Sequence, residues 1–201
     1  MQALLALIVA LGLQIAVNYS NDYSDGIRGT DDVRVGPIRL TASGLASAKA
    51  VKRAAFLSFG VACVAGLLLA AISSWWILIV GAISVLAAWG YTGGHTPYGY
   101  RGFGELSVFI FFGVVATVGT YYVQTLEFST AAFAASVSMG SLSCALLVIN
   151  NIRDRAQDAQ VGKKTLAVRL GDEKARKFFI ALLVLPYIFA PLTGNPLAFL
   201  T

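Results

Sequence analysis

Residues 54–72 read AAFLSFGVACVAGLLLAAI, a run of 19 residues without one charged side chain. A helix of about 20 apolar residues spans the hydrocarbon core of a membrane, so this run predicts a transmembrane helix. Comparable apolar segments lie at 2–19, 75–91, 105–125, 130–150 and 177–194. The sequence therefore predicts an all-α fold, a polytopic transmembrane helix bundle of about six spans that forms a single domain over residues 1–201.

The composition supports membrane residence. The chain is 57% hydrophobic and 12% charged, whereas soluble domains carry roughly 25% charged residues. Gly and Ala are frequent in the apolar segments, and small residues let membrane helices pack closely. Cys63 and Cys144 both lie inside apolar segments, which favours small buried hydrophobes over ligands or disulfides. The first segment begins at Met1 without a basic leader, so we expect a retained helix rather than a cleaved signal peptide.

The basic residues orient the predicted bundle. The net charge of +5 could suit nucleic acid, an anionic membrane face or an anionic substrate, and the high hydropathy argues against nucleic acid. All 15 Lys and Arg lie in three connections, 20–53, 92–104 and 151–176, if Lys177 at the edge of the last is included. The connections near 73–74 and 126–129 hold none. The positive-inside rule then places the three basic connections in the cytoplasm, with the chain integral to the inner or plasma membrane.

Two clusters of carboxylates flank basic connections. The first is NYSNDYSDGIRGTDD at 18–32, in which Asp22 and Asp25 are three residues apart and therefore share a helix face. The second is NNIRDRAQD at 150–158, in which Asp154 and Asp158 are four residues apart. Both clusters are expected on the same side of the membrane, at the ends of distant spans.

Clustered carboxylates on one face repel each other unless a cation lies between them. Mg²⁺ takes oxygen ligands, usually one or two carboxylates together with phosphate oxygens. Solvated caps at the membrane interface are the alternative interpretation. Asparagines and basic residues accompany both clusters, and this favours a Mg²⁺–diphosphate site with an apolar tail held in the bundle. The polar and basic residues that we expect to contact the substrate there are Asn18, Asn21, Arg28, Asn150, Arg153, Lys163 and Lys164.

Three stretches resemble a known family. NDYSDGIRGTDD at 21–32, residues 91–124 and NNIRDRAQDAQVGKKTLAVRLG at 150–171 are similar to the intramembrane aromatic prenyltransferases, the superfamily of the 4-hydroxybenzoate enzyme. The two acidic motifs are specific to the superfamily. The middle stretch resembles the 1,4-dihydroxy-2-naphthoate prenyltransferases.

The resemblance implies Mg²⁺-dependent transfer of a polyprenyl or phytyl group from its diphosphate to 1,4-dihydroxy-2-naphthoate, in menaquinone or phylloquinone biosynthesis. It implies Asp22, Asp25, Asp154 and Asp158 as the catalytic, metal-binding residues. Asn18 and Asn21 match polar residues beside the first motif, and Arg153, Lys163 and Lys164 fall where the family contacts diphosphate. The wider superfamily has an acid where this chain has Gly29, and Asp31 supplies it instead.

The chain is shorter than the resemblance implies. By fold analogy the family forms bundles of about nine helices, and we count about six spans here. We therefore expect a domain that is incomplete at both ends, lacking one helix at the front and about two at the back.

The loop GYTGGHTPYGYRG at 90–102 offers candidate contacts for the acceptor. Arg101 could hold the acceptor carboxylate or serve as a topology charge. Tyr91 and Tyr100 could face a carbocation through their rings, or belong to an interfacial aromatic belt. His95 is interpreted as a loop residue, with acceptor contact as the alternative.

Other functions fit less well. A CDP-alcohol phosphotransferase would share the start of the pattern, D22-x-x-D25-G26, but Gly29-Thr30 stands where that family has Ala-Arg. A transporter is expected to carry ionisable residues at mid-membrane, whereas the acids here lie at span ends or in loops. A purely structural subunit and prenyltransferases for 4-hydroxybenzoate or homogentisate remain alternatives.

Overall fold

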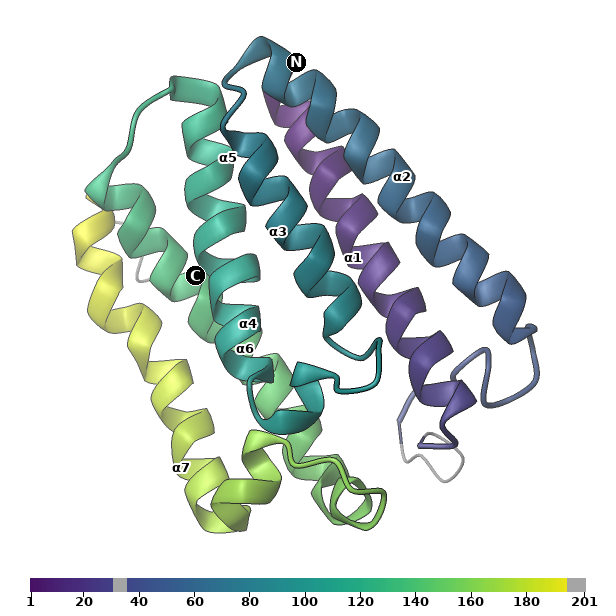
Figure 1. Ribbon diagram of the computed structural model, residues 1–201. Coiled ribbons are helices and arrows are strands. Elements are labelled where there is room, and N and C mark those ends of the chain that lie inside the picture. The colour runs from purple at the N-terminus through teal and green to yellow at the C-terminus, as the bar shows by residue number, and fades with distance from the viewer. Residues whose placement is uncertain (31–35, 195–201) are drawn as a thin grey trace.

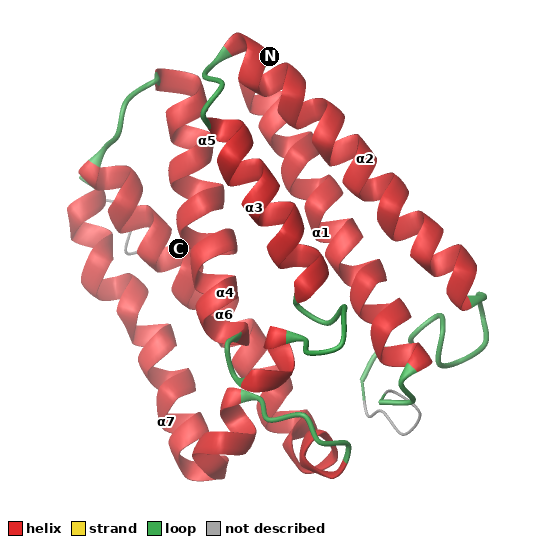
Figure 2. Ribbon diagram, viewed as in Figure 1, coloured by secondary structure: helices red, strands yellow, loops and turns green. Residues whose placement is uncertain are grey.

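The computed structural model describes residues 1–30 and 36–194, which form helices and connections with no strand among them (Figure 2). Each predicted apolar segment overlaps a helix. The main helices are α1 (Gln2–Ile27), α2 (Ala48–Ile72), α3 (Ile77–Gly90), α4 (Gly104–Val108), α5 (Ala116–Thr125), α6 (Thr130–Gln160) and α7 (Leu166–Phe189). A π-helical segment, η2 (Phe109–Val115), joins α4 to α5, and two short 3-10 helices are η1 (Tyr98–Arg101) and η3 (Ala190–Thr193).

Five helical stretches in this part of the chain are long and apolar enough to cross a membrane: Gln2–Ile27, Ala48–Ile72, Gly104–Thr125, Thr130–Gln160 and Leu166–Thr193. The remaining predicted span, 75–91, forms the shorter helix α3 of 14 residues. At about 1.5 Å per residue α3 covers roughly 21 Å, less than the hydrocarbon thickness of about 30 Å. The turn at 73–76 and the loop that begins at Tyr91 take up the rest of the predicted segment.

The stretch Gly104–Thr125 is one continuous rod formed by α4, η2 and α5. Its π-helical part passes very close to α6. A Cβ atom on Gly113 would stand 2.6 Å from the Cα of Gly140, so only glycine lets the two backbones approach at this crossing. The wider π-helical turn, which a periodicity argument does not predict, lies at this contact.

The helices pack as two antiparallel pairs with the rod and α3 between them (Figure 1). α1 lies along α2, and a core of Leu5, Ala6, Ala65, Leu69 and Val123 joins this pair to α5. α6 lies along α7, with a second core of Cys144, Ala145, Val148 and Leu182 that also meets the rod. Cys144 is buried as expected, whereas Cys63 is exposed on the outer face of α2.

At one end of the bundle, the lower end in Figure 1, lie the connection after α1 in its described parts, 28–30 and 36–47, and the connections 91–103 and 161–165. The two short connections at 73–76 and 126–129 lie at the opposite end. This arrangement agrees with the alternation of basic and uncharged connections in the sequence. α1 and α6 extend past their apolar parts toward the lower end, so Asp22 and Asp25 of the first cluster and Asp154 and Asp158 of the second are carried on helix ends rather than on loops.

Candidate functional site

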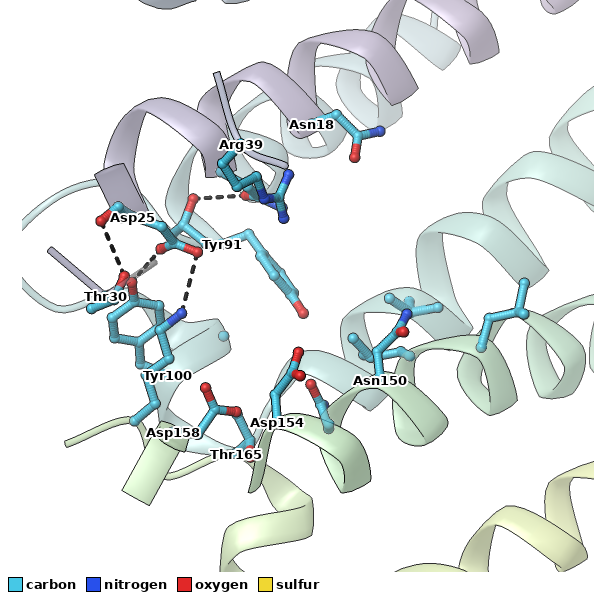
Figure 3. A pocket seen from close by; sticks show the side chains of 18 of the residues that line it. Asn18, Asp25, Thr30, Arg39, Tyr91, Tyr100, Asn150, Asp154, Asp158 and Thr165 are labelled. Carbon is cyan, nitrogen blue, oxygen red and sulfur yellow. Dashed lines mark hydrogen bonds and ion pairs between the residues drawn. The ribbon is translucent and has the colours of Figure 1, made fainter. Parts of the chain in front are cut away.

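A polar cavity of about 470 Å³ opens at the end of the bundle where the long connections meet. One wall is the end of α1 and the facing wall is the end of α6, so Asp25 lies across the cavity from Asp154 and Asp158 (Figure 3). Two acidic motifs separated by more than a hundred residues therefore line one space. The predicted site residues in its lining are Asn18, Asn21, Asp25, Tyr91, Asn150, Asp154, Asp158 and Lys163.

Asp25 is the centre of a buried polar cluster on the α1 wall. Its side chain is 7% exposed, and the Lys163 Nζ lies 3.2 Å from its Oδ2. The Tyr100 hydroxyl donates a hydrogen bond to Oδ1, and the Lys163 ammonium sits 4.7 Å from the centre of the Tyr100 ring. The connection after α6 thus places a cation against the carboxylate of α1, which ties the two walls together.

Burial disfavours the charge on Lys163, but attraction to Asp25, Tyr100 and Asp158 outweighs it and raises the pKa of this ammonium overall. Burial, followed by the negative charge of Asp25, raises the pKa of Tyr100. Lys163 is therefore a cation and Tyr100 a neutral donor at ordinary pH. A fixed cation in a cavity lined by carboxylates suits an anionic ligand that brings its own counter-ions.

The α6 wall presents its acids one helical turn apart. Asp154 is paired with its neighbour Arg153 through Nε–Oδ1 and Nη2–Oδ2 contacts of 2.6 and 2.7 Å. Asn151, also in the lining, donates to the Oε1 of buried Glu105 at 3.0 Å, which fixes the amide against the rod. Asn150 lies one turn before Asp154 on the same side of the helix (Figure 3).

Asp22 does not join Asp25 at the cavity. It is 5% exposed, and its two oxygens accept hydrogen bonds of 2.8 Å each from the backbone N–H groups of Leu40 and Thr41. Three residues along a helix correspond to about 300° of rotation, so a pair at this spacing diverges by about 60°. The two side chains lie on the same broad side of α1, as expected, but only Asp25 belongs to the cavity lining.

Several predicted substrate-binding residues are also absent from the lining. Arg28 donates to the carbonyl oxygens of Thr92 and Gly94 and so ties the end of α1 to the loop after α3. Arg153 is occupied by Asp154, and the Lys164 side chain is exposed while its backbone N–H donates to the Tyr100 carbonyl at 2.8 Å. Arg101 and His95 are exposed on their loop. Asp31 lies outside the described residues.

Other polar residues in the lining were not predicted. Arg39 extends into the cavity from the connection between α1 and α2 (Figure 3). Thr30, Gln157 and Thr165 complete the polar lining around Asp25 and Asp158. A lone arginine in a connection carries no motif, so the sequence indicates only its contribution to membrane topology.

The donor set fits a hard cation shared with a ligand rather than a metal held by protein alone. Among the described residues, no three His, Cys, Asp or Glu side chains lie close enough to hold a metal ion by themselves. Mg²⁺ is commonly bound by one or two carboxylates plus phosphate oxygens and water. Asp25 on one wall and Asp154 and Asp158 on the other could each supply such partial ligation.

An apolar cavity of about 380 Å³ continues from the polar one into the bundle. It lies between α1, α3 and the rod, and residues from Ala6 to Asn21 of α1 line it. Fifteen residues of helix correspond to about 22 Å, so the cavity runs along most of the apolar thickness. The residues that line both cavities are Gln14, Asn21, Tyr91, Val108, Phe112 and Leu147.

Comparison with known proteins identifies relatives over most of the chain. A 1,4-dihydroxy-2-naphthoate octaprenyltransferase of Mycobacterium tuberculosis is 51% identical over 98% of this chain and 72% of its own length. The Escherichia coli protein of the same description is 40% identical over 90% of this chain and 61% of its own length. A 2-carboxy-1,4-naphthoquinone phytyltransferase of Synechocystis is 29% identical over 82% of this chain and 53% of its own length.

The chain thus spans about three fifths to three quarters of the length of the bacterial relatives with the dihydroxynaphthoate description. No solved structure matches it significantly. Residues 1–201 match the UbiA prenyltransferase family throughout. Together with the five apolar helices, these similarities establish that the chain is an integral membrane protein and belongs to the UbiA prenyltransferase family.

Proposed function

We propose that this chain transfers a polyprenyl or phytyl group from its diphosphate to 1,4-dihydroxy-2-naphthoate, with Mg²⁺ as cofactor. The observation that carries the proposal is the joining of a polar, acid-lined cavity to an apolar cavity at Tyr91 and its neighbours. A prenyl diphosphate has one charged end and one long apolar end, and the two cavities match these parts in order. The names of the M. tuberculosis and E. coli relatives support the acceptor.

In this proposal the diphosphate lies between the α1 and α6 walls. Asp25, Asp154 and Asp158 would hold the cofactor, and Mg²⁺ when bound would neutralise the charge that develops on the leaving diphosphate. Lys163 supplies a permanent cation on the same side. The amide groups of Asn18, Asn21 and Asn150 offer neutral donors and acceptors around it.

The chemistry is an allylic substitution. The C–O bond to the diphosphate breaks with its electron pair on the leaving oxygen, and a C–C bond forms to the ring carbon that bears the carboxyl group, which departs as CO₂. Tyr91 lines both cavities, so its ring is suited to stabilise positive charge on the allylic carbon. The apolar side chains of Val108, Phe112 and Leu147 restrict water there and so protect the cation from hydrolysis.

The direct test uses the full chain reconstituted in lipid vesicles with a labelled prenyl diphosphate. Dihydroxynaphthoate and 4-hydroxybenzoate are offered separately, with Mg²⁺ or with a chelator. We expect prenylated, decarboxylated product only with the naphthoate and only with Mg²⁺. Product with 4-hydroxybenzoate alone, or product of equal yield in the chelator, would reject the proposed substrate or cofactor.

We also propose that the cavity end faces the cytoplasm, because it carries the basic connections. Single cysteines introduced at Ser43 and Glu127, both exposed at opposite ends of the bundle, would be probed in intact cells with a membrane-impermeant maleimide in a Cys63→Ala background. The Ser43→Cys protein should be labelled only after permeabilisation and the Glu127→Cys protein beforehand. Labelling of Ser43→Cys before permeabilisation and of Glu127→Cys only afterwards would show that the cavity end faces away from the cytoplasm.

A further inference from the structure

Asp22 holds the connection between α1 and α2 in place. Both of its carboxylate oxygens accept backbone hydrogen bonds, one from Leu40 and one from Thr41, each at 2.8 Å. Hydrogen bonds to an ionised acceptor are among the stronger ones in proteins. With both oxygens engaged and the side chain buried, Asp22 would have to give up both contacts before it could reach the cavity.

The same connection rests directly on α1 one turn further along. A Cβ atom on Gly26 would stand 2.5 Å from the side chain of Thr41 and 3.4 Å from the backbone nitrogen of Ala42. Glycine at this position therefore lets residues 41–42 lie against the helix. Two independent contacts, one polar and one steric, fix the backbone of the connection at Leu40 and Thr41.

Arg39 immediately precedes this anchored pair, and its side chain lines the polar cavity together with Asn18, Asp25 and Asp154 (Figure 3). A guanidinium keeps its charge at all ordinary pH values and matches phosphate oxygens through two parallel donors. Its aim into the cavity depends on where the backbone at 40–41 is held. Asp22 holds that backbone from α1 and is not part of the cavity lining.

We propose that Asp22 is a positioning residue rather than a metal ligand: it anchors the backbone of Leu40 and Thr41 so that Arg39 faces the diphosphate. The proposal rests on the proposed function for the identity of the ligand. It divides the first acidic motif into two roles. Asp25 acts within the cavity, and Asp22 acts through Arg39 from outside it.

The first test needs no turnover. Asp22→Ala and Asp25→Ala are compared in the full chain by hydrogen exchange and by binding of Mn²⁺ alone, followed by electron paramagnetic resonance. Asp22→Ala should lose exchange protection at the Leu40 and Thr41 amides while keeping Mn²⁺ binding. Asp25→Ala should weaken Mn²⁺ binding while keeping the two amides protected. The opposite assignment of these two losses would make Asp22 the metal ligand and overturn the proposal.

The second test measures coupling between Asp22 and Arg39. Loss of a charge-assisted hydrogen bond corresponds to a change in affinity of about 10- to 100-fold, so Arg39→Ala and Asp22→Ala should each raise the KM for the prenyl diphosphate by about that factor. The double variant should be no worse than either single one, because both remove the same contact. Full additivity, or an unchanged KM in Arg39→Ala, would refute the positioning role.

Asp22→Asn keeps the shape of the side chain and serves if the alanine variant does not fold. An amide offers one acceptor oxygen for two backbone donors, so the Leu40 and Thr41 amides should lose part of their exchange protection. The KM should fall between the values for the wild type and for Arg39→Ala. Wild-type values of both would refute the anchor. A wild type that transfers no prenyl group to any acceptor would defeat the proposed function, whereas the exchange result at Leu40 and Thr41 would stand independently.

Discussion

Replacing Gly113 with alanine should damage activity by separating two helices at their closest crossing. The new Cβ would stand 2.6 Å from the Gly140 Cα and 2.9 Å from the Ser136 carbonyl oxygen. These are backbone atoms and cannot rotate away. Ordinary contact begins near 3.4 Å, so the rod and α6 would move apart by about 0.8 Å, the difference between 3.4 and 2.6 Å, to restore it.

This displacement acts on the site because each helix carries one part of it. The rod carries Val108 and Phe112, which line both cavities, and α6 carries Asp154 and Asp158. A misplacement of about 1 Å in a positioned site can lower the rate about 10²-fold. Overpacking at a helix contact is expected to destabilise by about 1–3 kcal/mol, which leaves a folded population to assay.

The measurement is kcat/KM for the prenyl diphosphate alongside thermal unfolding followed by circular dichroism. Gly60→Ala is the matched control, because a Cβ at Gly60 of α2 meets nothing within 4 Å. It should have wild-type activity and stability. Wild-type activity and stability in Gly113→Ala as well would show that the close crossing does not position the site.

Three further predictions test the parts of the cavity. Lys163→Met breaks a buried ion pair with Asp25 and should lower the free energy of unfolding by about 3 kcal/mol, the low end for such pairs because Tyr100 still donates to the carboxylate. The pKa of Lys163 is raised, so this difference from wild type should hold up to about pH 10 and shrink only as the pH rises through the folded-state value; a difference already lost at pH 8 would contradict the pairing. Asp154→Asn should abolish turnover without affecting membrane insertion. The control Asp172→Asn, which changes an exposed acid paired with Arg176 on α7, should keep wild-type turnover. Equal activities of the two variants would show that Asp154 does not belong to the site. Gly119→Phe places a ring in the open space of the apolar cavity and should raise the KM for prenyl diphosphate about tenfold, because part of the buried tail area is lost. Inhibition by inorganic pyrophosphate, which has no tail, should stay unchanged. A parallel change in both would show that the ring does not act on the tail.

The spans were predictable because a membrane imposes a length and a composition that one sequence displays. Residues 54–72 have no charge to mark an internal boundary, and the helix there, α2, contains the whole predicted segment. The shortness of α3 and the π-helical turn in the rod were not predictable. Both depend on how neighbouring helices cross, as at Gly113 and Gly140, and hydropathy does not indicate where helices cross.

The acidic motifs indicated candidate site residues, but not which way each one faces. Asp25, Asp154 and Asp158 line one cavity. Asp22 is turned toward backbone donors that lie 18 and 19 residues later in the chain, a contact that helical spacing alone does not reveal. Arg39 was missed for the same reason, since a connection without repeating structure gives no face to assign.

The central claim is that Asp25 on α1 and the acids on α6 share one diphosphate through divalent cations. The most direct measurement is anomalous scattering from crystals of the full chain grown with Mn²⁺ and inorganic pyrophosphate. Peaks should lie inside the polar cavity, within about 2.2 Å of a carboxylate oxygen of Asp25 on one side and of Asp154 or Asp158 on the other. Mn²⁺ bound at Asp22, or only at the exposed acids Asp172 and Glu173, would contradict the account.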